Sequence, residues 1–430
     1  MMGFLDHNAV GAVPLARPGR ERKSVDFLTN AAAVLIGIFF FFSPFPHTTA
    51  IKEISFYSSL FIVLILASFM KRDFVLKTPF TLPFLLFLIW AIIGIFFTLD
   101  QSNTIHDIYA HNIKYLFLYY ILFNFYQSEK KFTLLVWIII ISVSIFCVGG
   151  LFYFYGLQRH SMAERFGFIE MSINYLCVPT ITAMLLSFNL YKYQTTWKSK
   201  IILLFAGAIT CLATLLTQTR GALIALIISI LLLSIGRKKA VLLLLTGVAI
   251  LIFIIPGFSG RLNDRDSLFN DRIAMNRLSL EIIKDHPITG IGFGMMIYAN
   301  PDFLESYHAK VPKDYRFGSG ILVPSPHNVF FDITVRTGII GLIAFCFMLG
   351  TFFHLVWKLF HHANSFVKDW GQCLFAIFCS IIIQGFFMDI TFGPQAVFFY
   401  MTLSMVSILW RLSLSTIAIR PSANLKTKAL

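Results

Sequence analysis

Long apolar runs alternate with short polar connections along almost the whole chain. Twelve of these runs are long enough to span a membrane, and they cover approximately residues 27–45, 54–70, 79–98, 112–127, 132–155, 169–190, 201–218, 221–236, 240–257, 331–356, 371–388 and 395–412. A helix needs about 20 mainly apolar residues to cross the hydrocarbon core of a bilayer. The pattern predicts an all-α polytopic membrane protein with about 12 transmembrane helices, built as a single integral membrane domain over residues 1–430.

The first apolar run has a second interpretation, because basic residues followed by an apolar stretch are also typical of a signal peptide. Arg17, Arg20, Arg22 and Lys23 precede it. The run is long, no small-residue cleavage site is evident in the SPFPHTT that follows, and many more runs come after it. We therefore interpret it as a retained first helix.

One long polar interval, residues 258–330, interrupts the pattern between predicted spans 9 and 10. Within it, apolar residues recur at a loose helical period over 267–285, which predicts an amphipathic helix lying along the membrane surface. Ser267 or Asn270 is the expected cap of its start. The interval ends with the glycine-rich KDHPITGIGFG and then PSPHNVFFD, so any chemistry is expected in or beside this loop.

Composition supports the membrane class, since 57% of residues are hydrophobic and only 13% are charged. The net charge of +14 comes from short clusters of cations between apolar runs, which argues against a nucleic-acid-binding patch. If the N-terminal tail is cytoplasmic, the cytoplasmic connections hold most of the lysines and arginines, and the opposite short loops hold only Lys52, Lys114, Arg159, Arg165 and Arg220. The positive-inside rule then places both termini in the cytoplasm and loop 258–330 outside, in the periplasm of a bacterium with an outer membrane.

Neither a metal site nor a nucleotide cofactor is indicated. The six cysteines all lie in apolar runs without C-x-x-C spacing, which argues against a disulfide framework or a zinc site. Asp264-Arg265-Asp266 resembles the D-x-D of metal-dependent sugar-nucleotide enzymes, but it is an isolated match. The G-x-G-x-G of residues 290–294 follows no predicted strand, so we do not interpret it as a dinucleotide loop.

Three arginines are candidates for holding an anion. Arg220 lies in TQTRG between two apolar runs, where it either extends to lipid headgroups or faces a wet, anion-holding cavity. Arg272 and Arg277 lie on the predicted amphipathic helix, where ordinary attraction to headgroups is the simpler explanation. The planar guanidinium suits phosphate oxygens, so a lipid phosphate is the more specific hypothesis.

His327 is the candidate for acid or base chemistry. Two prolines stiffen the Pro324-Ser325-Pro326-His327-Asn328 segment just before an apolar helix. An imidazole there can exchange a proton near neutral pH or stabilise an oxyanion, although a lone histidine is more often structural. Asp332 and Arg336 follow one helical turn apart, for which a local ion pair is the simplest explanation.

Three stretches together resemble the bacterial O-antigen ligase and O-antigen polymerase superfamily. They are TQTRGALIAL, DRIAMNRLSLEIIKDHPITGIGFG and PHNVFFDITVRTGIIGLIAF, and their order and the predicted topology match that family. Its members are lipid-linked glycan transferases with a GT-C-like helical membrane fold. The family's Arg-Gly pair matches Arg220 and Gly221, its loop arginine matches Arg272, and its His-Asn pair matches His327 and Asn328. The family commonly has an aromatic residue four positions after that loop arginine, where this chain has Asn276.

The resemblance implies transfer of a glycan from an undecaprenyl diphosphate carrier at the periplasmic face, without metal or cofactor. Arg220, Arg272 and His327 are then the predicted catalytic residues, with the arginines on the diphosphate. His327 would activate or orient the acceptor hydroxyl, or stabilise the leaving diphosphate if protonated. Gly221, Arg277, Asn328 and Arg336 are predicted to contact substrate.

The acceptor decides between related activities. A ligase uses lipid A-core, a polymerase uses a second carrier-linked glycan, and an oligosaccharyltransferase uses protein hydroxyls. The single long loop favours the ligase, with membrane lipids as the only other partner and no nucleic acid. A twelve-span transporter is the alternative from a different class, although no related halves are evident and the charges gather at one face.

Overall fold

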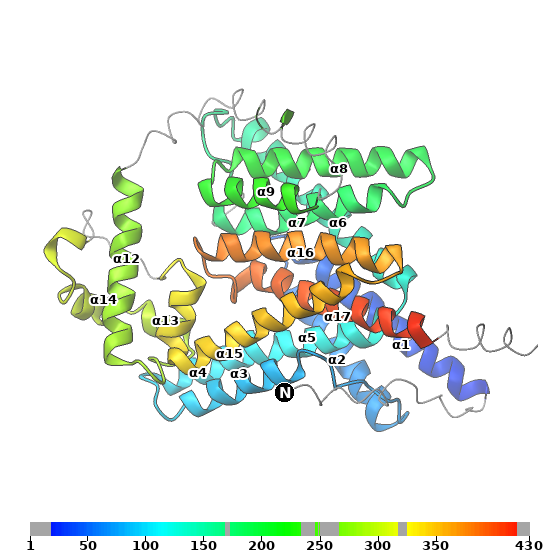
Figure 1. Cartoon of the computed structure of the whole chain (residues 1–430), viewed down its shortest axis with the longest axis horizontal. Coiled ribbons are helices and arrows are strands. Elements are labelled where there is room, and N and C mark those ends of the chain that lie inside the picture. Colours follow the sequence, from blue (N-terminus) through cyan, green and yellow to red (C-terminus); the bar gives the residue numbers. More distant parts are fainter. Residues whose placement is uncertain are drawn as a thin grey trace, which may run out of the picture.

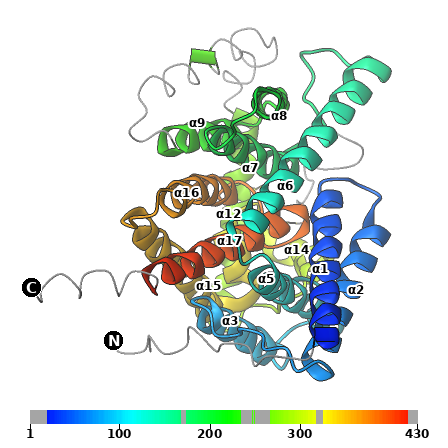
Figure 2. The same ribbon diagram turned by 90° about the vertical axis from the view of Figure 1, so that its right-hand side faces the viewer.

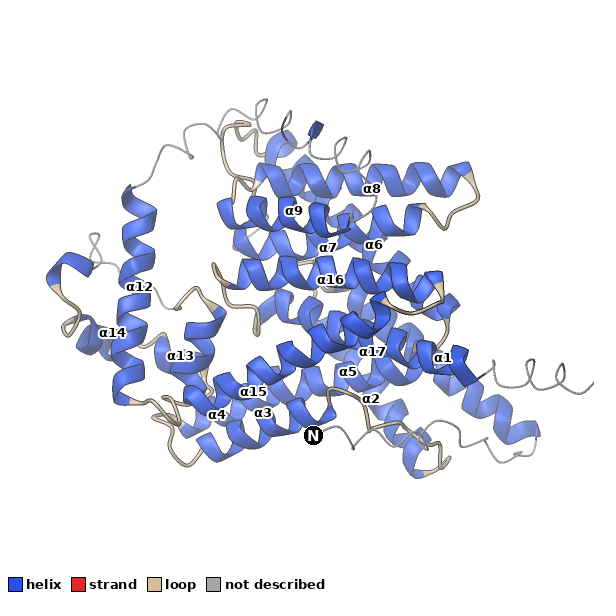
Figure 3. Cartoon of the chain, in the orientation of Figure 1, coloured by secondary structure: helices blue, strands red, loops and turns tan. Residues whose placement is uncertain are grey.

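The computed structural model describes residues 19–167, 173–233, 266–316 and 325–418, together with residues 246, 247 and 249. Every regular element in these residues is a helix (Figure 3). The elements are α1 (Gly19–Phe42), α2 (Thr49–Ser68), α3 (Thr81–Gly94), α4 (Gln101–Asp107), η2 (Ile108–Ile113), α5 (Lys114–Phe125), α6 (Glu129–Leu151), η3 (Phe152–Leu157), α7 (Ile173–Tyr191), α8 (Trp197–Leu216), α9 (Arg220–Leu233), α12 (Asp266–Asp285), α13 (Met295–Tyr298), α14 (Pro301–His308), η4 (Lys313–Tyr315), α15 (Val329–Phe360), α16 (Ser365–Gly385) and α17 (Gly393–Ala418).

Seven helical segments in this part of the chain are long and apolar enough to cross a membrane, and α3, α7 and α9 are shorter apolar helices. The protein is therefore a polytopic membrane protein, as predicted. Helices overlap eleven of the twelve predicted spans, whereas the predicted span 240–257 lies outside the described residues except for 246, 247 and 249. The count of about 12 spans and the GT-C-like architecture stay predictions.

The long helices run side by side as one bundle (Figures 1 and 2). Its centre is α17, of which 78% of the most apolar window is buried, while α2 at the edge has only 22% buried. Large apolar side chains such as Phe61, Leu64 and Phe205 are exposed on peripheral helices. In water this surface would be unfavourable, so it is suited to lipid contact.

The loop between the bundle helices forms a layer across one end of the bundle. Figure 1 shows α12 running across the direction of the long helices, with α13 and α14 beside it. This layer has its own apolar core, in which Ala274, Leu278 and Ile282 of α12 are buried together with Ile297 and Leu304. The predicted amphipathic helix is therefore confirmed as a helix, and its apolar face packs within the protein. Because α12 begins at Asp266, Ser267 and Asn270 lie inside it rather than capping it.

The glycine-rich segment after α12 forms backbone hydrogen bonds with α15 at a break in that helix. Gly338 has φ +66° in the first third of α15, which interrupts the helical hydrogen bonds there. The N–H groups of Ile291 and Gly292 donate to the carbonyls of Val335 and Arg336 at 2.9 and 3.1 Å, and the N–H of Ile339 donates to Pro287 at 2.9 Å. The glycines are therefore needed for backbone pairing, which positions the loop layer against α15.

Candidate active site

Arg272 reaches from α12 to the turn between α16 and α17. Its guanidinium carbon lies 5.0 Å from the centre of the Phe387 ring, and its Nη1 donates to the Phe387 carbonyl at 3.5 Å. The side chain is half-buried, and burial lowers the pKa of Arg272 below its ordinary value. Within the described part of the chain, this guanidinium is partly desolvated and makes a long hydrogen bond to a carbonyl, so it is well placed to take an anion.

Gly221 brings the start of α9 to the same turn. A Cβ atom at Gly221 would lie 2.6 Å from Cδ2 of Phe387, so only glycine allows this approach. Arg220, the first residue of α9, is thereby held at the same end of the bundle, with its side chain half-buried. A small, partly open cleft lies here, lined by Thr219, Gly221, Ala222, Gln384, Phe387 and Met388.

His327 approaches from the third direction, on the segment that leads into α15. Its backbone has φ +47°, in the left-handed region that non-glycine residues seldom adopt. Burial lowers the pKa of His327, and the positive charge of nearby Arg272 lowers it further. The imidazole makes no hydrogen bond to any residue in the described part of the chain. The lowered pKa favours the neutral form of the ring.

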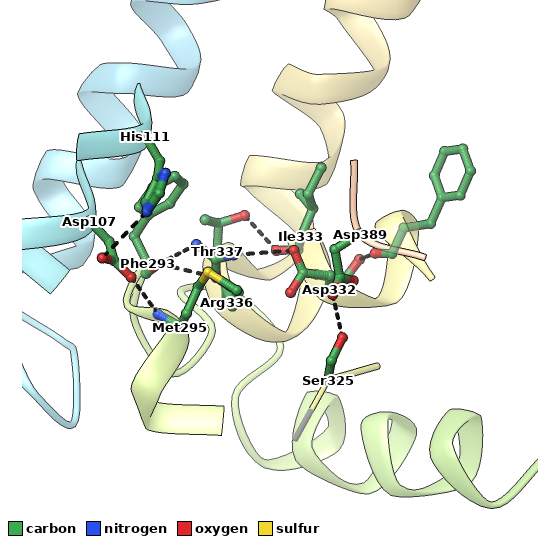
Figure 4. Close-up of polar contacts among 12 residues, drawn as sticks. Asp107, His111, Phe293, Met295, Ser325, Asp332, Ile333, Arg336, Thr337 and Asp389 are labelled. Atoms are coloured by element: carbon green, nitrogen blue, oxygen red, sulfur yellow. Dashed lines mark hydrogen bonds and ion pairs between the residues drawn. The ribbon is translucent and has the colours of Figure 1, made fainter. Parts of the chain in front are cut away.

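Two residues that the sequence analysis did not select hold this histidine. Ser325 Oγ donates to Asp389 Oδ2 and accepts from the His327 N–H at 3.2 Å. Asp389 lies on the α16–α17 turn, and Figure 4 shows it beside Ser325. Burial raises the pKa of Asp389, and the Ser325 hydroxyl opposes that rise. An acidic residue between two apolar runs was the available signal, since such residues are costly unless they have a function.

Phe387, the residue shared by Arg272 and Gly221, carried no signal in the sequence. It is one of 48 phenylalanines and lies in the apolar stretch GFFMDITFG. Its importance comes from contacts with α9 and α12, which lie more than 100 residues earlier in the chain. Only the tertiary structure brings these elements together.

Arg277 lies away from this group. It is five residues after Arg272, which turns it about 140° around the helix. Its guanidinium carbon lies 4.8 Å from the centre of the Tyr315 ring in η4, and the side chain is exposed. The structure therefore places the two loop arginines on different faces of α12.

Asn328 is the N-cap of α15. Its side-chain oxygen accepts from the N–H groups of Phe330 and Phe331 at 2.9 and 3.3 Å. This contact secures the start of the helix immediately after His327. The observed partners of its oxygen are therefore backbone groups of its own chain.

Arg336 is buried at the break in α15 and is only 2% exposed. Its Nη1 pairs with Asp332 Oδ2 at 3.2 Å, its Nε and Nη2 both donate to the Phe293 carbonyl, and its guanidinium stacks 3.7 Å from the centre of the Phe392 ring (Figure 4). The local ion pair considered from the sequence is present. These contacts tie the glycine-rich segment to α15, at the opposite side of Asp332 from Ser325 and Asp389 in Figure 4.

Among the described residues, no group of three or more histidine, cysteine, aspartate or glutamate side chains is arranged to hold a metal ion. Asp264 of the D-x-D match lies outside those residues. The site described above is therefore built from two arginines, an imidazole, a buried carboxyl group and aromatic rings.

No curated protein matches the chain. The family model for O-antigen ligase matches residues 204–346. The match begins in α8, includes α9 and the loop layer, and ends within α15, so it contains Arg220, Arg272 and His327, while Phe387 and Asp389 lie beyond it. Over residues 204–346 the chain therefore carries a domain of the O-antigen ligase family, whose members transfer glycans.

Proposed function

We propose that this protein is an O-antigen ligase, which transfers a glycan from undecaprenyl diphosphate to lipid A-core at the periplasmic face of the inner membrane. The family match supports a lipid-linked glycan as the substrate class. The observation that carries the proposal is made at the α16–α17 turn. Arg272 donates to the Phe387 carbonyl and Gly221 packs against the Phe387 ring, while Ser325, which donates to Asp389 of the same turn, accepts from the His327 N–H.

The arginines act on the leaving group. The bond between the anomeric carbon of the first sugar and the phosphate oxygen breaks, so negative charge grows on the diphosphate. Arg272 and Arg220 stabilise that charge more in the transition state than in the ground state, because the bond is then partly broken. The low dielectric around half-buried Arg272 strengthens the interaction.

His327 acts on the acceptor. A bond forms between the acceptor oxygen and the anomeric carbon, and the proton of that hydroxyl passes to the imidazole. The lowered pKa of His327 favours the neutral ring, and therefore the role of base over that of a positively charged stabiliser. Ser325 and Asp389 position the histidine through its backbone N–H.

The acceptor is tested by lipopolysaccharide from a strain that lacks the protein. For a ligase, the polymeric bands disappear while carrier-linked polymer is retained. Core carrying a single unit would instead indicate a polymerase, and a defect confined to glycoproteins would indicate a protein oligosaccharyltransferase. If polymeric bands, core bands and glycoproteins were all unchanged, the result would contradict glycan transfer.

Complementation then tests the residues. Wild-type protein restores the polymeric bands, whereas His327→Ala and Arg220→Ala, present in the membrane at wild-type amounts, do not. Full activity of His327→Ala would overturn the proposed base. An unchanged rate of Arg220→Ala at limiting donor would show that Arg220 only contacts headgroups.

A further inference from the structure

A second group of cations lies at the other end of the bundle. Helix α5 begins beside the α16–α17 turn, where the rings of His111 and Phe392 are 4.7 Å apart. Its far end, with the buried rings of Phe123 and Phe125, therefore lies away from the candidate active site. Arg72, from the segment after α2, and Arg411, near the end of α17, both pack there.

Arg72 is held between helices. Its guanidinium carbon lies 5.0 Å from the centre of the Phe125 ring and 5.5 Å from that of Phe74. Its Nη1 donates to the hydroxyl of Thr29 on α1, and its backbone N–H donates to the Leu66 carbonyl at 2.9 Å. No carboxylate in the described residues lies within ion-pair distance of it.

Arg411 is also half-buried. Its guanidinium carbon lies 5.4 Å from the centre of the Phe123 ring. Its Nη1 is buried and makes no hydrogen bond with any residue that the structure describes. A buried guanidinium N–H without an acceptor is unfavourable, so an acceptor such as a lipid phosphate oxygen would stabilise it.

The two guanidinium groups repel one another. Burial lowers the pKa of Arg72, and the positive charge of Arg411 lowers it further, while Asp26 opposes the effect. Lys131 at the start of α6 is close enough to interact electrostatically with Arg72. Among the described residues, the cations Arg72, Arg411 and Lys131 thus interact with one another, and Asp26 is the acid that opposes their effect.

Two other cations that are predicted to lie on the cytoplasmic side, Lys130 and Lys198, have a different environment. Their side chains are exposed. Such lysines extend into water or headgroups without a specific site. Arg72 and Arg411 instead lie against aromatic rings between helices, where their direction is fixed.

We propose that Arg72 and Arg411 form a binding site for the phosphate of an anionic lipid in the leaflet next to this end of the bundle. Planar guanidinium groups suit phosphate oxygens, and basic pockets between helices on the cytoplasmic side recognise lipid headgroups. Phe27 and Phe69, which are 71% and 82% exposed, lie close in sequence to Thr29 and Arg72 and provide apolar surface for the acyl chains. A lipid fits better than free phosphate because these exposed apolar side chains lie within three residues of Thr29 and Arg72 in the chain.

The test is the thermal unfolding of the purified full-length protein in a mild detergent. Phosphatidylglycerol should raise the Tm of the wild-type protein by about 3 °C or more, because a ligand that binds only the folded state stabilises it. Phosphatidylcholine should raise it less, since its headgroup has no net charge. Inorganic phosphate at the same concentration should have little effect, and an equal effect would overturn the lipid as the ligand.

The variant Arg72→Gln/Arg411→Gln should lose at least half of the phosphatidylglycerol shift, whatever its own Tm. The matched control Lys130→Gln/Lys198→Gln removes the same charge from exposed positions and should keep the shift. Native mass spectrometry gives an independent readout, in which one phosphatidylglycerol adduct should be lost from the arginine variant alone. Equal shifts and equal adducts in both variants would overturn the site.

Discussion

At the scale of single residues, the five-residue spacing between Arg272 and Arg277 places two chemically identical side chains on different faces of α12. Arg272 and Arg277 were both candidates from the sequence. Arg272 contacts Phe387 at the candidate active site, whereas Arg277 stacks on Tyr315 in the loop layer. The diphosphate role is therefore proposed for Arg272, and Arg277 becomes its natural control.

Arg272→Ala should reduce kcat/KM for the lipid-linked donor by about 100-fold or more, because it removes a positive charge from the developing diphosphate. Arg277→Ala should stay within about threefold of wild type, since an exposed cation contributes little. Purified protein with a defined donor and acceptor provides the measurement. Equal losses in both variants would contradict the assignment of the two faces of α12.

The pH dependence tests the proximity of His327 and Arg272. Protonation inactivates a base, so activity should fall on the acid side as pH drops through a pKa that lies below the ordinary 6.5. Arg272→Gln removes the positive charge that lowers this pKa. The acid limb of its residual activity should therefore move to higher pH.

The control for this measurement is Arg277→Gln, which should keep the wild-type acid limb. The pH profile of kcat/KM is the quantity to compare, because it reports on the free enzyme. An acid limb that stays in place in Arg272→Gln would show that the two side chains are electrostatically independent.

At the scale of elements, the loop and α15 form one backbone unit. The glycine-rich segment supplies N–H groups to carbonyls that the break at Gly338 leaves without helical partners. Gly338 packs directly against the Ile288 carbonyl, where no side chain fits. Because His327 precedes α15 and Arg272 precedes the glycines, this pairing sets how the two approach one another.

Gly338→Ala should destabilise the protein by about 2 kcal/mol or more, from the unfavourable backbone conformation and the clash with Ile288. Gly350 lies on the same helix with no atom within 4 Å of an added Cβ, so Gly350→Ala should be neutral or stabilising by up to about 1 kcal/mol. Thermal unfolding in detergent measures both. Equal losses of stability in the two variants would show that position 338 does not need glycine for its backbone conformation or for its packing against Ile288.

At the scale of the whole molecule, the connections of the bundle separate into two ends. Lys192 and Tyr193 after α7 pair with Asp369 at the start of α16, which joins two connections predicted to be cytoplasmic. At the other end, the segment before α15 contacts the α16–α17 turn through Ser325 and Asp389. These contacts agree with the prediction, from the distribution of lysine and arginine, that successive connections lie at alternate ends of the bundle.

Orientation in the membrane follows as a prediction. In spheroplasts of a variant without native cysteines, Met296→Cys in the loop layer should react with a membrane-impermeant maleimide. Lys130→Cys, at the start of α6, should react only after permeabilisation. Both side chains are exposed, so access depends on the side of the membrane. The reverse result would place the candidate active site in the cytoplasm.

The sequence by itself determined the membrane class, most span positions, the helix in the loop and the catalytic candidates. These follow from local properties, because apolar length, helical period and isolated charges are visible in single stretches. The Asp332–Arg336 pair is equally local. The glycines of the loop also carried a signal, although its meaning did not follow from the sequence.

Only the tertiary structure decided which candidates meet. Phe387 looks like any other apolar residue until α9 and α12 pack around it, and Asp389 gains its role only when Ser325 lies beside it. Arg336 was predicted to contact substrate, and the structure adds that Asp332, Phe293 and Phe392 enclose its guanidinium. Contacts between distant segments depend on how helices pack, and a pattern of apolar and polar residues leaves that packing undetermined because several arrangements bury the same faces.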